Sequence, residues 1–169
     1  MVTPVYDFTT GYEAALGSAQ TVGPGSDEAV TRFKSFMASL SPDSIRERTA
    51  TVYAATAYLN DNLNEVHGAS AIEAHLATSL EGLSAIEVDF HDTARADSDW
   101  FLRWTMRTTF RSLRGGAKVV TSGVTHLRFD GEGRVLIHRD FWDAATGVYE
   151  HIPVLGAGIR AIKRRITGD

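Results

Sequence analysis

The spacing of apolar residues changes partway along this chain. After Ser26 or Asp27, either of which can cap a helix, apolar residues recur at the helical spacing at Val30, Phe33, Phe36, Met37 and Leu40. A second short helix is predicted from Ser41-Pro42-Asp43 to near Thr49, because Ser caps and Pro fits a first turn. The β-prone run 51–60 predicts a strand and the run 60–64 a loop that ends at Gly68. Ser70 and Glu73 then form a predicted capping box for the next helix.

From residue 84 onward, apolar and polar residues alternate, which is the pattern of half-buried strands. Four such runs cover residues 84–93, 99–113, 118–130 and 133–143, and short turns at 114–118 and 130–133 separate the last three. Consecutive strands with short turns indicate an antiparallel meander. A helical turn or two is predicted over 144–151, and a helix over 155–166.

The two ends of the chain differ from its middle. Residues 1–26 show no period and are rich in Gly, so we interpret them as an N-terminal arm, with a single domain over 27–169. The helix 155–166 ends in basic residues. They could meet an anionic ligand or a lipid head group, but cations are also favoured at any helix C-terminus, which is the interpretation we prefer.

Helices followed by strands predict an α+β fold: a cone-shaped, curved antiparallel sheet wrapped by N-terminal helices, plus a C-terminal helix. The mouth of such a cone is a natural pocket for a small molecule.

Composition narrows the function classes only a little. Of 169 residues, 43% are hydrophobic and 22% charged, with no cysteine and a net charge of −4. This balance does not favour a nucleic-acid or membrane partner, and cysteine chemistry is excluded. No signal-peptide pattern begins the chain, so we expect a cytoplasmic protein. The histidines lack metal-ligand spacing, and we expect neither a metal nor a cofactor.

The run 133–143 carries the candidate chemistry. On a strand, Leu136, His138, Asp140 and Trp142 share one face. An Asp among apolar and aromatic side chains is partly desolvated, which makes Asp140 a candidate general base. The simpler alternative is that Asp140 only pairs with a neighbouring Arg or His.

The order of elements, with "HGASAIEAHL" at 67–76 and "GEGRVLIHRDFWD" at 131–143, resembles the nuclear transport factor 2-like superfamily. The most similar branch contains SnoaL-like polyketide cyclases and limonene-epoxide hydrolase. In the hydrolases a Tyr-x-Asn pair and an Asp hold the attacking water. The resemblance therefore implies that Tyr58 and Asn60 orient a water for Asp140.

The acid that this hydrolase mechanism also needs has no counterpart here, because Trp104 and Met106 occupy its positions. Cyclases and isomerases of the superfamily need only a carboxylate that removes a proton next to a carbonyl. The resemblance then implies Asp140 as base, with His138, Tyr58 and Asn60 as its catalytic partners. The expected substrate-binding wall consists of Leu102, Trp104, Met106 and Trp142.

Two functions remain open from the sequence. One is a cofactor-independent isomerase, cyclase or hydrolase that acts on a small apolar molecule. The alternative is a non-catalytic ligand-binding or assembly domain of the same fold. We also expect a homodimer through the outer face of the sheet, which carries Arg103, Thr105, Arg107, Val124, Ile137 and Phe141.

Overall fold

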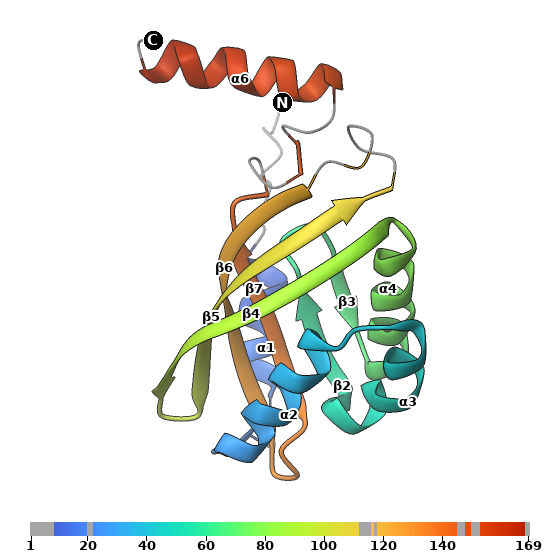
Figure 1. Ribbon diagram of the computed structural model, residues 1–169. Coiled ribbons are helices and arrows are strands. Elements are labelled where there is room, and N and C mark those ends of the chain that lie inside the picture. The colour runs from blue at the N-terminus through green and yellow to red at the C-terminus, as the bar shows by residue number, and fades with distance from the viewer. Residues whose placement is uncertain are drawn as a thin grey trace, which may run out of the picture.

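One curved sheet forms the frame of the molecule, and helices lie on both of its faces (Figure 1). The structure is a computed structural model that describes residues 9–19, 22–111, 116, 118–144, 148–149 and 153–167. Its helices are α1 (Thr10–Ser18), α2 (Asp27–Ala38), α3 (Pro42–Val52), α4 (Ala69–Glu81) and α6 (Pro153–Thr167). Its strands are β1 (Val22–Gly23), β2 (Tyr53–Asn60), β3 (Glu65–His67), β4 (Leu83–Ala96), β5 (Asp99–Phe110), β6 (Lys118–Asp130) and β7 (Val135–Trp142).

The predicted α+β fold is confirmed, with one difference in the sheet. The strands follow the order β3-β2-β7-β6-β5-β4, and β1 pairs with β6 beside this path. The meander β4 to β7 is antiparallel, as predicted. However, β2 runs parallel to β7, so the sheet is mixed. A parallel pair needs a long crossover, and the helix α4 with the meander provides it.

Helix starts follow the sequence signals in two cases out of three. Ser26 caps α2 by accepting a hydrogen bond from the Ala29 backbone, and Ser41 opens α3 with a full capping box. The capping box predicted from Ser70 and Glu73 is wrong, because α4 begins two residues earlier than an N-cap at Ser70 would place it. Its N-cap is Gly68, at φ 87°. The segment before it, predicted as a loop, contains the short strand β3.

The N-terminal arm contains an element that the sequence did not predict. Helix α1 packs on the outer face of the sheet, where Tyr12, Ala15 and Leu16 meet a cluster that contains Tyr58 and Ile137. Its large apolar residues are few and stand between Gly11 and Gly17, so no clear helical period was visible in the sequence.

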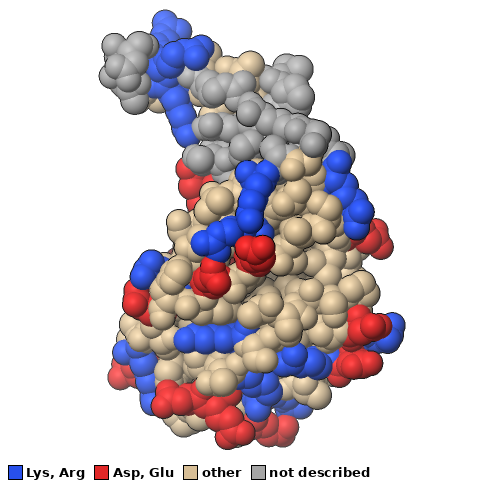
Figure 2. All heavy atoms as spheres, viewed as in Figure 1, with Lys and Arg blue, Asp and Glu red and all other residues tan. Residues whose placement is uncertain are grey.

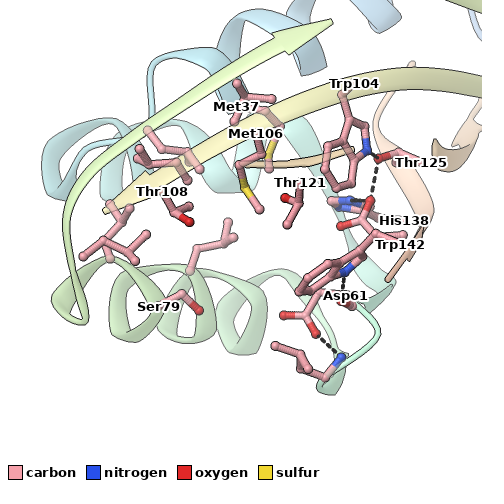
Figure 3. A pocket seen from close by; sticks show the side chains of 18 of the residues that line it. Met37, Asp61, Ser79, Trp104, Met106, Thr108, Thr121, Thr125, His138 and Trp142 are labelled. Carbon is pink, nitrogen blue, oxygen red and sulfur yellow. Dashed lines mark hydrogen bonds and ion pairs between the residues drawn. The ribbon is translucent and has the colours of Figure 1, made fainter. Parts of the chain in front are cut away.

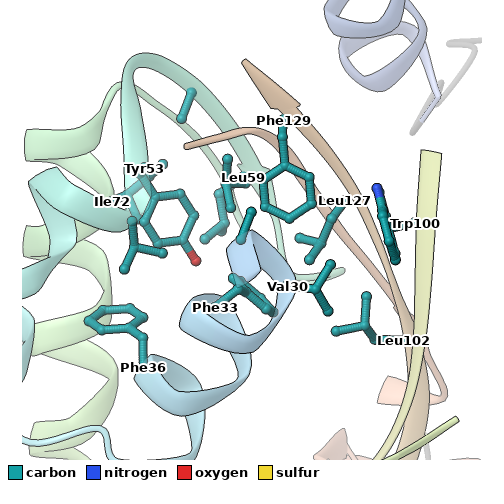
Figure 4. Packing of buried hydrophobic residues seen from close by; sticks show 14 of the residues in the cluster. Val30, Phe33, Phe36, Tyr53, Leu59, Ile72, Trp100, Leu102, Leu127 and Phe129 are labelled. Carbon is teal, nitrogen blue, oxygen red and sulfur yellow. The ribbon is translucent and has the colours of Figure 1, made fainter. Parts of the chain in front are cut away.

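The main hydrophobic core lies on the inner face, between the sheet and α2, α3 and α4 (Figure 4). Phe33 and Phe36 of α2 contact Tyr53 edge-on. Leu102, predicted to bind substrate, is fully buried in this core. The core closes one end of the space under the sheet and leaves the other end for a cavity.

The C-terminal helix α6 stands clear of the sheet and of α1 to α4 (Figure 1). Among the described residues, no helix is both long and apolar enough to cross a membrane. Most of the predicted turn at 114–118, and most of the predicted helical turns at 144–151, lie outside the described residues.

Candidate functional site

A cavity of about 320 Å³ lies between the inner face of the sheet and the helices α2 and α4 (Figure 3). That volume is at the lower end of the range for small-molecule sites. Its wall is mainly aliphatic and aromatic, and includes Met37, Leu76, Leu80, Ile86, Val88, Phe90, Trp104, Met106, Phe110 and Trp142. A few polar groups interrupt this wall, and they decide what the cavity can do.

Asp140 is the most prominent of these polar groups. Its side chain is only 16% exposed. The oxygen Oδ1 accepts a hydrogen bond from Thr125 Oγ1 at 2.5 Å and lies 3.1 Å from His138 Nε2. Among the described residues the second oxygen, Oδ2, has no hydrogen-bond partner. Two donors on one oxygen hold the carboxylate in a fixed orientation and leave the other oxygen for a bound molecule.

Tyr53 and Asp140 together fix the tautomer of His138. The Tyr53 hydroxyl lies 2.8 Å from His138 Nδ1. Burial, with the nearby charge of Asp140, raises the pKa of Tyr53 well above its usual value, so the phenol keeps its proton. The Asp140 carboxylate only accepts, so His138 Nε2 carries the proton that faces it. In that tautomer Nδ1 accepts from the Tyr53 hydroxyl. The sequence pattern did not indicate a role for Tyr53, although this residue shares a strand face with the cavity residue Leu59.

Thr125 connects Asp140 to Trp104 on the neighbouring strand. Trp104 Nε1 donates to Thr125 Oγ1 at 2.8 Å, so the Thr125 hydroxyl must donate its own proton to Asp140. The Trp104 ring lies against Gly123, where any Cβ would come within 2.5 Å of it. Glycine at this position therefore lets the indole reach Thr125.

Tyr58 and Asn60 are not brought to Asp140. The register places Leu59 beside His138, whereas Tyr58 and Asn60 pair with Ile137 and Arg139 on the opposite face. There Tyr58 donates to Glu65 Oε2 at 3.0 Å, and Asn60 accepts from Arg139. The water-holding trio implied by the resemblance is therefore not assembled.

The other predicted site residues divide between cavity and core. Trp104, Met106 and Trp142 line the cavity together with His138 and Asp140. Leu102 does not, because the core under α2 encloses it. Leu136 leaves the face of His138 and packs with the cluster under α1, since the β6–β7 register shifts at its position.

A second His–carboxylate pair lines the same cavity, and the sequence did not indicate it. His75 Nε2 on α4 lies 2.8 Å from Asp61 Oδ2. Asp61 also accepts from the backbone of Leu63 and Asn64, and its carbonyl accepts from Trp142 Nε1 at 2.7 Å. The only sequence signal was the run of Asn and Asp residues at 60–64. This pair ties the loop to α4 and to β7, so it holds that edge of the cavity in place.

A separate titratable cluster lies on the outer face, under α1. His126 Nδ1 is 2.7 Å from the Tyr12 hydroxyl. Its Nε2 lies 2.9 Å from Asp99 Oδ1, but it is misaligned for a hydrogen bond. Arg128 binds Asp99 with two nitrogens. Burial lowers the pKa of His126 despite the nearby carboxylate. For Asp99, burial alone raises the pKa, but the bonds from Arg128 and the charge of His126 hold it below its usual value.

Among the described residues, no group of three or more His, Asp or Glu side chains is arranged to hold a metal ion. The polar part of the cavity wall includes the Asp140 carboxylate and its two hydrogen-bond donors, and most of the rest is apolar.

Comparison with known proteins places these features in a family. The family model described as the SnoaL-like domain matches residues 26–138. No functionally curated protein matches the chain in sequence.

Solved structures share the fold at low sequence identity. A protein with a ketosteroid isomerase-like fold from Catenulispora acidiphila, solved with trimethylamine, has a TM-score of 0.62 at 16% identity, over 73% of this chain and 91% of its own. An epoxide hydrolase of M. tuberculosis has a TM-score of 0.58 at 16% identity, over 78% of this chain and 91% of its own. A protein named as a SnoaL-like polyketide cyclase from Shewanella putrefaciens has a TM-score of 0.60 at 17% identity, over 72% of this chain and 93% of its own.

Proposed function

This chain belongs to the SnoaL-like domain family, and on that premise we propose that its cavity takes a small, largely apolar carbonyl compound, with Asp140 as the general base. The observation that supports this most is the state of the Asp140 carboxylate. Thr125 and His138 bind one oxygen, while the other has no partner among the described residues and belongs to a cavity with an apolar wall. A fixed carboxylate in a poorly hydrated cavity is suited to proton abstraction next to a carbonyl.

The proposed step moves one proton. Asp140 Oδ2 takes the proton from the carbon next to the carbonyl, the C–H electron pair shifts to form the enolate, and the same carboxylic acid returns the proton to a carbon of the product. This step needs no cofactor. His138 and Tyr53 act as positioning residues: His138 binds Oδ1 and leaves Oδ2 for the substrate, and Tyr53 holds the His138 ring in place.

Thr121 is the best candidate to bind the substrate oxygen. Its hydroxyl oxygen is buried without a hydrogen-bond partner among the described residues, and the residue lines the cavity. This hydroxyl gains a hydrogen-bond partner when the carbonyl or enolate oxygen of a substrate binds. The bond is stronger to the negatively charged enolate oxygen, so it stabilises the intermediate.

Epoxide opening is a weaker candidate, because Tyr58 and Asn60 lie on the other face and Trp104 and Met106 cannot act as acids.

The test uses exchange of carbon-bound protons. A panel of cyclic ketones and β-diketones is incubated with the protein in D₂O, and deuterium incorporation is followed by NMR. We expect Asp140→Asn to lower the exchange rate by about 10²–10⁴-fold. Asp143→Asn, the same change at an exposed Asp outside the cavity, is the matched control and retains the rate. Equal rates for wild type and Asp140→Asn would remove Asp140 as the base.

A non-catalytic binding domain is the second candidate, favoured by the missing acid at the positions of Trp104 and Met106. Native mass spectrometry of the purified protein separates the two functions. If wild type and Asp140→Asn retain the same small molecule equally and neither exchanges any ketone, binding is the function.

A further inference from the structure

The C-terminal helix α6 has two chemically distinct faces. It contains four basic residues and no acidic one, in a chain whose net charge is −4. Ile159, Ile162 and Ile166 recur at the spacing of one helix face. Lys163 and Arg165 border this stripe on its two sides, and Arg160 and Arg164 lie farther round the helix. Cations at a helix C-terminus explain Arg164 and Arg165. They do not explain the isoleucine stripe.

The structure adds that this apolar face is exposed. Ile162 is 60% exposed and Ile166 is 79% exposed. Figure 1 shows α6 clear of the rest of the described fold, and Figure 2 shows Lys and Arg side chains gathered on it. Large aliphatic side chains aligned on one side of an exposed helix mark an interaction surface.

We propose that α6 binds the surface of an anionic lipid bilayer. The helix would lie in the plane of the interface, with the isoleucines at the boundary of the acyl chains and the Lys and Arg side chains against the lipid phosphates. The charge of α6 is opposite to that of such a surface, whereas the chain as a whole is acidic. Nucleic acid is less suited as the partner, because phosphate contacts leave an isoleucine face unused.

This contact is peripheral and does not cross the bilayer. A helix of 15 residues is about 22 Å long, shorter than the apolar thickness of a membrane. The proposal does not depend on what the cavity binds or catalyses.

The experiment measures sedimentation of the full chain with vesicles of phosphatidylcholine plus phosphatidylglycerol, and with vesicles of phosphatidylcholine alone. We expect the wild type to bind only the anionic vesicles and to be released by high salt. Replacing Lys163, Arg164 and Arg165 together by Gln abolishes binding.

A matched pair of variants separates the apolar face from charge alone. Ile162→Asp and Ala161→Asp add the same charge to adjacent exposed positions, but Ala161 lies away from the isoleucine stripe. One added charge lowers binding about fivefold. Ile162→Asp also removes an inserted side chain, so we expect a loss of at least about fiftyfold.

Three results would overturn the proposal: no binding to anionic vesicles, equal losses from Ile162→Asp and Ala161→Asp, or a preference for duplex DNA that survives Ile162→Asp. A doubled mass in light scattering that Ile162→Asp abolishes, without vesicle binding, would assign the face to a second copy of the chain.

Discussion

Thr121 and Thr125 occupy the same strand and the same cavity wall, yet their hydroxyls are in opposite states. Thr125 accepts from Trp104 and donates to Asp140, whereas the Thr121 oxygen has no partner among the described residues. A buried polar atom without a partner costs about 1–3 kcal/mol. The same substitution should therefore have opposite effects at the two sites.

We predict that Thr121→Val leaves the free energy of unfolding unchanged or raises it by up to about 1 kcal/mol, and weakens ligand binding about tenfold. Thr125→Val should lower the free energy of unfolding by about 1–3 kcal/mol, because it leaves Trp104 Nε1 without its acceptor and removes one of the two donors to Asp140. Urea titration and ligand titration measure the two quantities. A large destabilisation by Thr121→Val would mean that its hydroxyl is already satisfied in the folded protein.

The two tyrosines of β2 show what the sequence could and could not predict. The match of Tyr58-Leu59-Asn60 to a known motif favoured Tyr58, but strand alternation places Leu59 on the inner face and Tyr58 on the outer one. Tyr53 lies on the same face of the strand as Leu59, and its hydroxyl contacts His138. Alternation within β7 placed His138, Asp140 and Trp142 together correctly. The contact between β2 and β7 is a long-range parallel pairing, and local pattern does not specify its register.

At the scale of elements, the position of Trp104 depends on a glycine in the adjacent strand. The Gly123 backbone lies beneath the Trp104 ring, and a methyl group there would meet both that ring and the Phe141 carbonyl oxygen. We predict that Gly123→Ala lowers the free energy of unfolding by about 1–3 kcal/mol through overpacking. It should also displace Trp104 from Thr125, which a shift in tryptophan fluorescence would report. Gly131→Ala, with open space around it, is the matched control.

Docking of α1 should depend on pH through His126. Its pKa is lowered in the folded protein, so the unfolded chain binds a proton first as the pH falls below about 6.5. Stability is then complete above that pH and decreases as the pH falls below it. Asp99, whose pKa is also lowered, adds a further loss only at stronger acidity.

Urea unfolding across this range measures the effect, and His126→Gln should flatten the profile. His91→Gln changes an exposed histidine on β4 and should leave it unchanged. A wild-type stability that is constant from about pH 7 to about pH 5 would contradict the role of His126.

Helix α1, which the sequence pattern did not predict, and helix α2, which it did, show why some elements are easier to predict than others. Helix α2 buries Phe33 and Phe36, so its apolar period is strong. Helix α1 has no fully buried residue, and it docks mainly through Tyr12, which bonds to a histidine more than 100 residues away. The position of α1 depends on contacts with residues that are distant in the sequence, so the pattern of neighbouring residues does not predict it.

At the scale of the whole molecule, the described residues cover the outer face of the sheet only in part. Helix α1 packs over Ile137, and Tyr12 meets Phe141 edge-on. Beyond α1, Arg103 and Arg107 pair with Asp92 and Asp89, while Val120 is 58% exposed and Phe141 45%. Apolar side chains between ion pairs resemble the core and rim of a protein interface.

We therefore predict a homodimer through this face, with twice the chain mass of 18.4 kDa in light scattering. Val120→Asp should halve that mass, because a charge at the centre of the interface is desolvated without a partner. Ile166→Asp, which places the same charge at an exposed position on α6, should leave the mass unchanged. A wild-type mass of a single chain would refute the dimer. A loss of mass from Ile166→Asp but not from Val120→Asp would move the interface from the sheet to α6.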